Sequence, residues 1–169
     1  MRRAWMVGMA LLLALASPAR AIMSGAESRL EASSDADYAA GKAAFEREDW
    51  PGTIANLTLV VMRRPWHDNA HAMLGYAWRK LGRYDLSFAS YHETLALNPR
   101  HRGALAYLGE AYLELGREEH ARATLLRLAE VCDLVVMAFD NQGWKSGCEE
   151  LLELKAAFET HGVALPGGS

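Results

Sequence analysis

The chain lacks an excess of basic residues. Lys and Arg number 18 and Asp and Glu number 21, which gives a formal net charge of −3 at pH 7. Nucleic acids and anionic lipid surfaces are bound through dense clusters of Lys and Arg. The composition therefore argues against a nucleic-acid partner and against binding to a membrane surface.

Motifs that mark common active sites are also missing. The sequence has no Gly-rich phosphate loop, no nucleophile elbow and no paired-carboxylate motif. It contains two cysteines, Cys132 and Cys148, and no Cys-x-x-Cys motif. We therefore expect a protein that is not an enzyme and that needs no cofactor.

The hydrophobic run near the N-terminus is too short to span a bilayer. Residues 4–16 form an apolar stretch, and a transmembrane helix needs about 20 such residues. Arg2 and Arg3 precede this stretch and Ala19-Arg20-Ala21 follows it, which is the pattern of a secretory signal peptide over residues 1–21. A retained membrane anchor is the alternative interpretation.

Cleavage after Ala21 predicts a periplasmic protein with no membrane anchor. No Cys lies at the cleavage point, which argues against a lipid-anchored protein. Cleavage removes three arginines and no acidic residue, so the formal net charge falls from −3 to −6. We expect a mildly acidic mature protein.

What the chain does contain is an internal repeat. Gly41, Gly75 and Gly109 stand 34 residues apart, and this spacing is the repeat period. Four further features recur after the same period: Leu74 as Leu108, Trp78 as Tyr112, Pro65 as Pro99, and Leu81-Gly82-Arg83 as Leu115-Gly116-Arg117. A fixed repeat of this length indicates an array of stacked helix pairs. We therefore expect an all-α solenoid.

Three helix pairs are predicted within residues 35–131. Their approximate ranges are 35–47 with 50–62, 68–81 with 84–97, and 102–115 with 118–131. Gly82 and Gly116 each follow the first helix of a pair, where a left-handed residue ends a helix. Pro65 and Pro99 follow second helices because Pro cannot extend a helix. Asp49 is expected to cap the helix that follows it.

The rest of the chain departs from the repeat. The predicted segments are a signal peptide at 1–21, a flexible lead-in at 22–34, an irregular insert at 132–146, a capping helix at 147–161 and a tail at 162–169. Leu151, Leu154, Ala157 and Phe158 lie on one face of the capping helix. Terminal elements of such arrays are atypical because they cover the exposed end of the core.

The three periodic glycines are expected to have a packing role. They lie inside predicted helices, where Gly costs about 1 kcal/mol relative to Ala. Three such costs at a fixed period indicate that each glycine lets a neighbouring helix approach closely.

The sequence resembles the tetratricopeptide repeat family. The family pattern is W-x2-L-G-x2-Y, then A-x3-F, then P, within each repeat. The matching positions are His71-x2-Leu74-Gly75-x2-Trp78, Ser87-x3-Tyr91 and Pro99 in one copy, and Leu105-x2-Leu108-Gly109-x2-Tyr112 and Ala121-x3-Leu125 in the next. A degenerate first copy includes Ala40-Gly41, Leu57 and Pro65. The resemblance covers about residues 34–133 and extends to small exported proteobacterial proteins of this family.

The resemblance implies a function as well as a fold. It implies a tetratricopeptide-type α-solenoid of three helix-turn-helix repeats plus a C-terminal capping helix. Such a solenoid is expected to act as a protein–protein interaction module or adaptor, with a partner peptide or helix in its concave groove. Assembly of the array ends into homo-oligomers is also possible.

Repeat geometry places particular side chains on the concave face. They are Tyr38, Lys42, Phe45, Asn69, Ala72, Tyr76, Arg79, Ala106, Glu110 and Leu113. The predicted partner-binding residues among them are Tyr38, Lys42, Asn69, Tyr76, Arg79 and Glu110. Lys42 and Arg79 could meet a carboxylate, and Tyr38 and Tyr76 could stack on a peptide. The alternative is that these are ordinary solvated residues.

Part of this groove is similar to a known carboxylate-binding arrangement. Some tetratricopeptide modules hold a partner's C-terminal carboxylate with two basic residues and Asn from successive first helices. Lys42 and Asn69 are similar to part of that arrangement, whereas the third pair offers no matching cation.

The two cysteines are predicted to form a structural disulfide, because an exported protein with an even number of cysteines favours one. Closing a loop of about 15 residues stabilises a protein by about 3 kcal/mol. Two free buried thiols, or a redox or metal role, are the alternatives for Cys132 and Cys148.

A second interpretation of function uses metal or redox chemistry. His67 and His71 are four residues apart and could share one helical face, although Glu does not follow the first His as in zinc-binding helices. A metal- or redox-linked periplasmic protein that uses His67 and His71, or Cys132 and Cys148, is therefore the alternative function.

Overall fold

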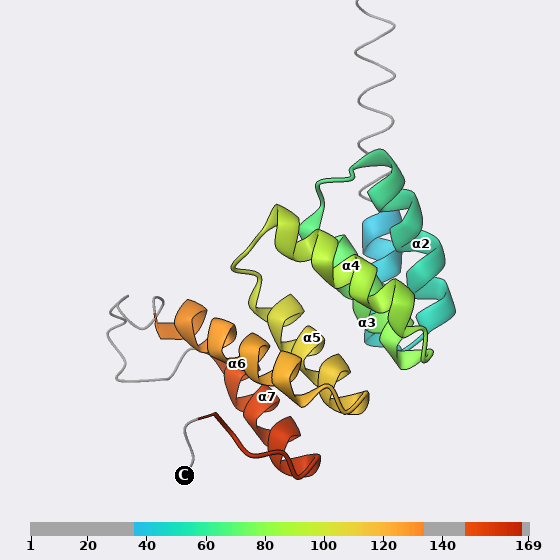
Figure 1. The fold of residues 1–169 in the computed structure, drawn as a ribbon. Coiled ribbons are helices and arrows are strands. Elements are labelled where there is room, and N and C mark those ends of the chain that lie inside the picture. Colours follow the sequence, from blue (N-terminus) through green and yellow to red (C-terminus); the bar gives the residue numbers. More distant parts are fainter. Residues whose placement is uncertain (1–35, 134–147, 167–169) are drawn as a thin grey trace, which may run out of the picture.

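A computed structural model describes residues 36–133 and 148–166 (Figure 1). The predicted signal peptide, the lead-in at 22–34, nearly all of the insert at 132–146 and the last residues of the tail lie outside the described residues. Within the described ranges the regular structure is helical, with no strand. The helices are the first helix at 36–46, α2 (Trp50–Arg63), α3 (Asp68–Lys80), α4 (Tyr84–Leu97), α5 (Arg102–Glu114), α6 (Glu118–Asp133) and α7 (Glu149–Thr160).

The helices form a stacked array in chain order (Figure 1). α3 packs mainly on α4, and α5 packs mainly on α6. α2 packs on α3, while α7 packs on both α5 and α6. The predicted all-α solenoid of three helix pairs and a capping helix is confirmed.

Left-handed residues end the first helix of each pair, as the sequence predicted at two of three positions. Gly82 and Gly116 have φ values of 70° and 66°. Their amides and those of the next residues donate to the last carbonyls of α3 and α5. Glu48 takes the same place in the first repeat with φ of 58°. A residue with a Cβ is strained in this region, so this turn is less favourable than the other two.

The three periodic glycines lie at close helix contacts, which confirms their predicted role. A Cβ at Gly41 would lie 2.5 Å from Leu57, and one at Gly75 would lie 2.5 Å from Tyr91. These partners belong to the second helix of the same pair. A Cβ at Gly109 would lie 2.7 Å from Leu154 of α7. The lack of a side chain at Gly109 therefore lets the capping helix, α7, pack closely on α5.

Buried side chains form two clusters along the array. The smaller cluster contains Leu57, Val60, Ala70 and Leu74. The larger one extends from α3 to α7 and includes the fully buried Leu154 and Phe158 of the capping helix. Fully burying such a side chain contributes about 1.5 to 3 kcal/mol, so the capping helix is an integral part of the core.

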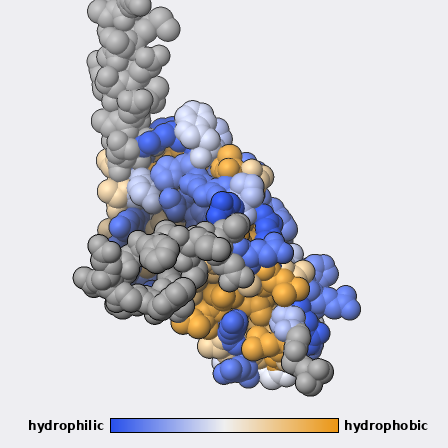
Figure 2. All heavy atoms as spheres, turned by 90° about the vertical axis from the view of Figure 1, so that its left-hand side faces the viewer, coloured by the Kyte–Doolittle hydropathy of each residue, from blue (hydrophilic) through white to orange (hydrophobic). Residues whose placement is uncertain are grey.

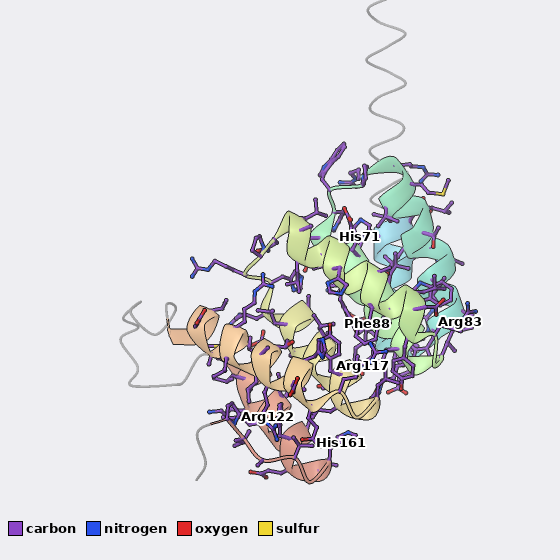
Figure 3. The ribbon with its side chains drawn as sticks, viewed as in Figure 1. His71, Arg83, Phe88, Arg117, Arg122 and His161 are labelled. Atoms are coloured by element: carbon purple, nitrogen blue, oxygen red, sulfur yellow. A yellow bond between two sulfur atoms is a disulfide. The ribbon has the colours of Figure 1, made fainter. Side chains whose placement is uncertain are left out.

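The chain after α7 returns along α6. Arg122 of α6 donates from Nε to the carbonyl of Ala164 at 3.1 Å (Figure 3).

Exposed Leu126 and Leu152 lie on α6 and α7. Figure 2 shows hydrophobic side chains gathered in the lower part of the face turned to the left in Figure 1.

Cys132 and Cys148 lie at disulfide-bonding distance, with their Cα atoms 5.8 Å apart. Cys132 lies near the end of α6, and Cys148 is the N-cap of α7. Both side chains are buried. The pair therefore connects the last repeat helix to the capping helix.

Asp49 caps α2 as predicted, because its Oδ1 accepts the amide of Gly52 at 2.9 Å. Among the described residues, none of the helices is both long and apolar enough to cross a bilayer.

Candidate functional site

A hollow of about 390 Å³ lies between the first helix, α3, α5 and α7. We call this hollow the groove. Side chains from three successive repeats and from the capping helix line it. The groove is therefore a product of the whole array and not of one helix pair.

Half of the residues placed on the concave face by repeat geometry line the groove. They are Tyr38, Lys42, Phe45, Asn69 and Ala72. Gly103, which the sequence places with Ala106 and Glu110 in the third pair's part of this face, also lines the groove. The remaining lining residues were not predicted, and they are Glu46, Met73, His101, Tyr107 and Glu150. Repeat spacing could have located Tyr107, which stands one repeat period after Met73. Nothing in the repeat pattern pointed to Glu150.

Arg79 is buried, with 4% of its surface exposed. Its Nη2 atom lies 2.6 Å from Oε2 of Glu110, and its Nη1 atom lies 3.0 Å from Oε1 of Glu114. The guanidinium is therefore neutralised by two carboxylates of α5. This corrects the prediction that Arg79 meets a carboxylate of a partner. Glu110, which was also predicted to bind a partner, instead pairs with Arg79 within the protein.

Tyr76 is packed among aromatic rings instead of lying free in the groove. Its ring centroid lies 5.1 Å from Phe45, 5.5 Å from Trp50 and 4.7 Å from Tyr107. The Arg79 guanidinium also lies 5.0 Å from the Tyr76 ring centroid. Tyr76 thus supports the groove wall formed by Phe45 and Tyr107, and the prediction that it stacks on a peptide does not fit this position.

His101 orients the Asn69 side chain. The amide of Ala104 donates to Nδ1 of His101 at 3.1 Å, so this nitrogen carries no proton. The proton is therefore on Nε2, which donates to Oδ1 of Asn69 at 3.1 Å. Burial lowers the pKa of His101, which favours this neutral form. The Asn69 side chain is exposed, so its Nδ2 group is open to solvent.

His67 has the same capping role one repeat earlier. Its Nδ1 atom accepts the amide of Ala70 at 3.3 Å. Burial lowers the pKa of His67 as well. His67 and His101 stand one repeat period apart, so a histidine N-cap is a repeat feature that the sequence analysis missed.

His71 stabilises the turn before α3. Its Nε2 atom donates to the carbonyl of Pro65 at 2.9 Å (Figure 3). His67 and His71 therefore each use one ring nitrogen within the protein. Across residues 36–133 and 148–166, no group of three or more His, Cys, Asp or Glu side chains is arranged to hold a metal ion.

Lys42 is the cation of the groove. Its Nζ atom lies 3.8 Å from Oε1 of Glu46, and the two side chains are 60% and 64% exposed. Exposed pairs of this kind contribute about 0 to 1 kcal/mol. Lys42 can therefore exchange Glu46 for another acceptor at little cost.

Known proteins share this fold. Residues 79–131 match the family model described as tetratricopeptide repeat. A structure of the TPR2B domain of yeast Sti1 in a complex with pHsp70 is 20% identical, with a TM-score of 0.64, and the match covers 76% of this chain and 97% of that chain. No curated protein matches the sequence.

Two further structures are similar. The first TPR of Spaghetti (RPAP3), bound to the HSP90 peptide SRMEEVD, is 17% identical with a TM-score of 0.56, covering 75% of this chain and 93% of that one. The Sgt2 TPR domain from Aspergillus fumigatus is 18% identical with a TM-score of 0.58, covering 80% and 86%. At these identities the likeness establishes the fold alone.

Proposed function

Because the chain belongs to the tetratricopeptide repeat family, we propose that its groove holds a segment of a partner protein. Two similar domains are described with Hsp70 or with an HSP90 peptide, which supports a peptide as the occupant. The observation on which the proposal rests is the groove itself, which the Asn69 amide lines together with apolar side chains.

The groove offers complementary chemistry for a polypeptide. Ala72, Met73 and Tyr107 provide an apolar surface for one or two side chains. Asn69 Nδ2 can donate to a backbone carbonyl, and Lys42 can reach a second acceptor. A volume of about 390 Å³ lies within the usual size of ligand pockets. Together these groups support binding, and the proposal assigns no reaction to the groove.

We place this activity in the periplasm, with the protein acting as an adaptor. The support for this setting is the signal-peptide pattern of residues 1–21 and the two cysteines, which suit an oxidising compartment.

A groove-filling variant tests the proposal. A Cβ at Gly103 would lie 3.5 Å from His101 and 3.7 Å from Tyr107, which is ordinary contact. The Cβ of Gly103→Phe therefore fits, and a bulky side chain at this lining position should fill part of the groove. Ala96→Phe adds the same ring at an exposed position of α4, away from the groove, and serves as the matched control.

Calorimetric titration with a peptide from a co-purified periplasmic protein gives the readout. Gly103→Phe should weaken binding by at least about tenfold, since losing one buried anchor costs more than about 1.4 kcal/mol, while Ala96→Phe binds normally. Equal affinity of Gly103→Phe and the unmodified protein would show that the partner binds elsewhere.

A further inference from the structure

Aromatic rings from two separate helices line the groove. Tyr38 and Phe45 line it from the first helix, and Tyr107 lines it from α5. Tyr76 of α3 packs on both Phe45 and Tyr107, with ring centroids 5.1 Å and 4.7 Å away. Tyr38 packs on His67 at 4.5 Å. The rings are therefore held by the fold before a partner binds, so using them costs little side-chain entropy.

Small residues lie beside these rings in the groove lining. Ala72 of α3 stands one repeat period after Tyr38, so a methyl group takes the place that a phenol ring has in the preceding repeat. Gly103 of α5 has no side chain, and a Cβ there would lie 3.5 Å from His101 and 3.7 Å from Tyr107. The hollow of about 390 Å³ exceeds the roughly 150 Å³ of an engineered cavity that holds benzene. It can therefore take an aromatic side chain.

The charged groups that line the groove are paired within the chain. Nζ of Lys42 lies 3.8 Å from Oε1 of Glu46. Oε1 of Glu150 lies 3.6 Å from Nε of Arg102. The imidazole of His101 is neutral, because its Nδ1 atom accepts a backbone amide. The groove therefore offers no excess charge of either sign.

A charged partner residue would gain little in this groove. It would have to replace Lys42 or Glu46 in a pair whose side chains are both exposed, or Arg102 or Glu150 in a pair that is partly exposed. Exposed ion pairs contribute little, so the exchange of one pair for another provides little selectivity. An uncharged side chain leaves both pairs intact and gains the free energy of burying apolar surface.

We infer that the groove selects its partner segment by one uncharged side chain, either aromatic or large and aliphatic. This side chain packs on Ala72 beside the rings of Tyr38 and Tyr107, and the flexible thioether of Met73 adapts to its shape. The inference rests on the proposed function and names the class of segment that is bound. Selection then comes from apolar burial, because the paired charges favour neither acidic nor basic segments.

Random peptides displayed on phage provide a probe that assumes no partner. The purified full chain is the bait, and enriched peptides are synthesised and measured by fluorescence anisotropy at low and high salt. One derivative of each peptide has Ala in place of the shared apolar residue, and another has Gln in place of every charged residue. Gly103→Phe reports whether a peptide occupies the groove, and Ala96→Phe is its control at an exposed position of α4.

The inference predicts peptides that share one aromatic or large aliphatic residue and no charged residue. The Ala derivative should bind at least about tenfold more weakly, because it lacks the buried anchor. The Gln derivative should bind within about twofold of its parent, and high salt should have as small an effect, because charge pairing contributes little.

Two kinds of result separate the inference from the proposed function. Peptides that Gly103→Phe excludes, but whose affinity depends on a charged residue, falls steeply at high salt or survives the change to Ala, would overturn the inference alone. Peptides that Gly103→Phe binds as tightly as Ala96→Phe does, or a selection that enriches no peptide, would overturn the proposed function as well.

Discussion

Nε2 of His101 and Oδ1 of Asn69 lie 3.1 Å apart and join the start of α5 to the start of α3. The same imidazole accepts the amide of Ala104 at the helix start. One side chain thus connects a structural role, helix capping, with the orientation of a groove amide. Because His101 binds Oδ1 of Asn69, the donor group that Asn69 offers in the groove is its Nδ2.

Replacing His101 separates these two roles. Asn is an efficient N-cap, so His101→Asn should change the free energy of unfolding by less than about 0.5 kcal/mol, whereas His101→Ala should lower it by about 1 kcal/mol. Both variants lose the donor to Asn69 and should weaken peptide binding. Urea unfolding and anisotropy measure the two effects. Normal binding by His101→Asn would mean that the orientation of Asn69 does not matter.

Stability should depend on pH through the two histidine caps. Burial lowers the pKa of His67 and of His101 below the value of 6.5. Between the lowered values and 6.5 the unfolded chain binds more protons than the folded chain, so stability falls as the pH falls through this window. We therefore expect the free energy of unfolding to fall as the pH is lowered from above 6.5 through the lowered pKa values of the two histidines.

Urea unfolding at a series of pH values measures this loss. Replacing both His67 and His101 with Asn should flatten the profile, because Asn caps without titrating. A loss of the same size in the double variant would assign the pH dependence to other groups.

Gly75→Ala should be destabilising although Ala is the better helix former. The added Cβ would lie 2.5 Å from the Tyr91 ring, and such overpacking costs about 1 to 3 kcal/mol. Gly103→Ala is the matched control, because its Cβ fits, and it should be neutral or slightly stabilising. Thermal unfolding compares the two. Equal melting temperatures would mean that the contact between α3 and α4 relaxes freely.

Glu48→Gly should stabilise the protein. Glu48 is exposed and holds φ of 58° at the position that glycine takes in the next two repeats. Removing the Cβ relieves a cost of about 1 kcal/mol. Chemical unfolding measures the gain, and a lower stability would contradict the strain assigned to this turn.

Pairing of Cys132 with Cys148 should contribute to stability. Replacing both with Ala should lower the free energy of unfolding by about 3 kcal/mol, because the loop between them becomes free in the unfolded chain. Intact mass before and after reduction gives the oxidation state directly. Two thiols that react with a labelling reagent in the unfolded, unreduced protein would contradict the pairing.

The sequence predicted the fold well because the repeat period reflects helix packing directly. Gly75 and Gly109 mark close helix contacts, and Gly82 and Gly116 mark helix ends, so their positions follow from backbone geometry. The groove was harder to predict. Arg79 has the correct position in the repeat for the concave face, but Glu110 and Glu114 reach it from the next repeat.

The packing of the capping helix explains why Glu150 was not predicted to line the groove. Glu150 reaches the groove only because α7 packs on α5, where Leu154 lies against Gly109. This contact connects segments that share no repeat spacing. The choice of N-cap was also unexpected, since Ser, Thr, Asp and Asn are the usual caps, and His67 and His101 perform this role here.

A site-specific photo-crosslinker tests the central claim most directly. The central claim is that a partner segment lies in the groove. A benzophenone side chain at Lys42, in the groove, and one at Thr58, exposed on α2 outside the groove, are each irradiated with a bound partner peptide. The account predicts a crosslinked product from position 42 and none from position 58. A product from position 58 and none from position 42 would contradict it.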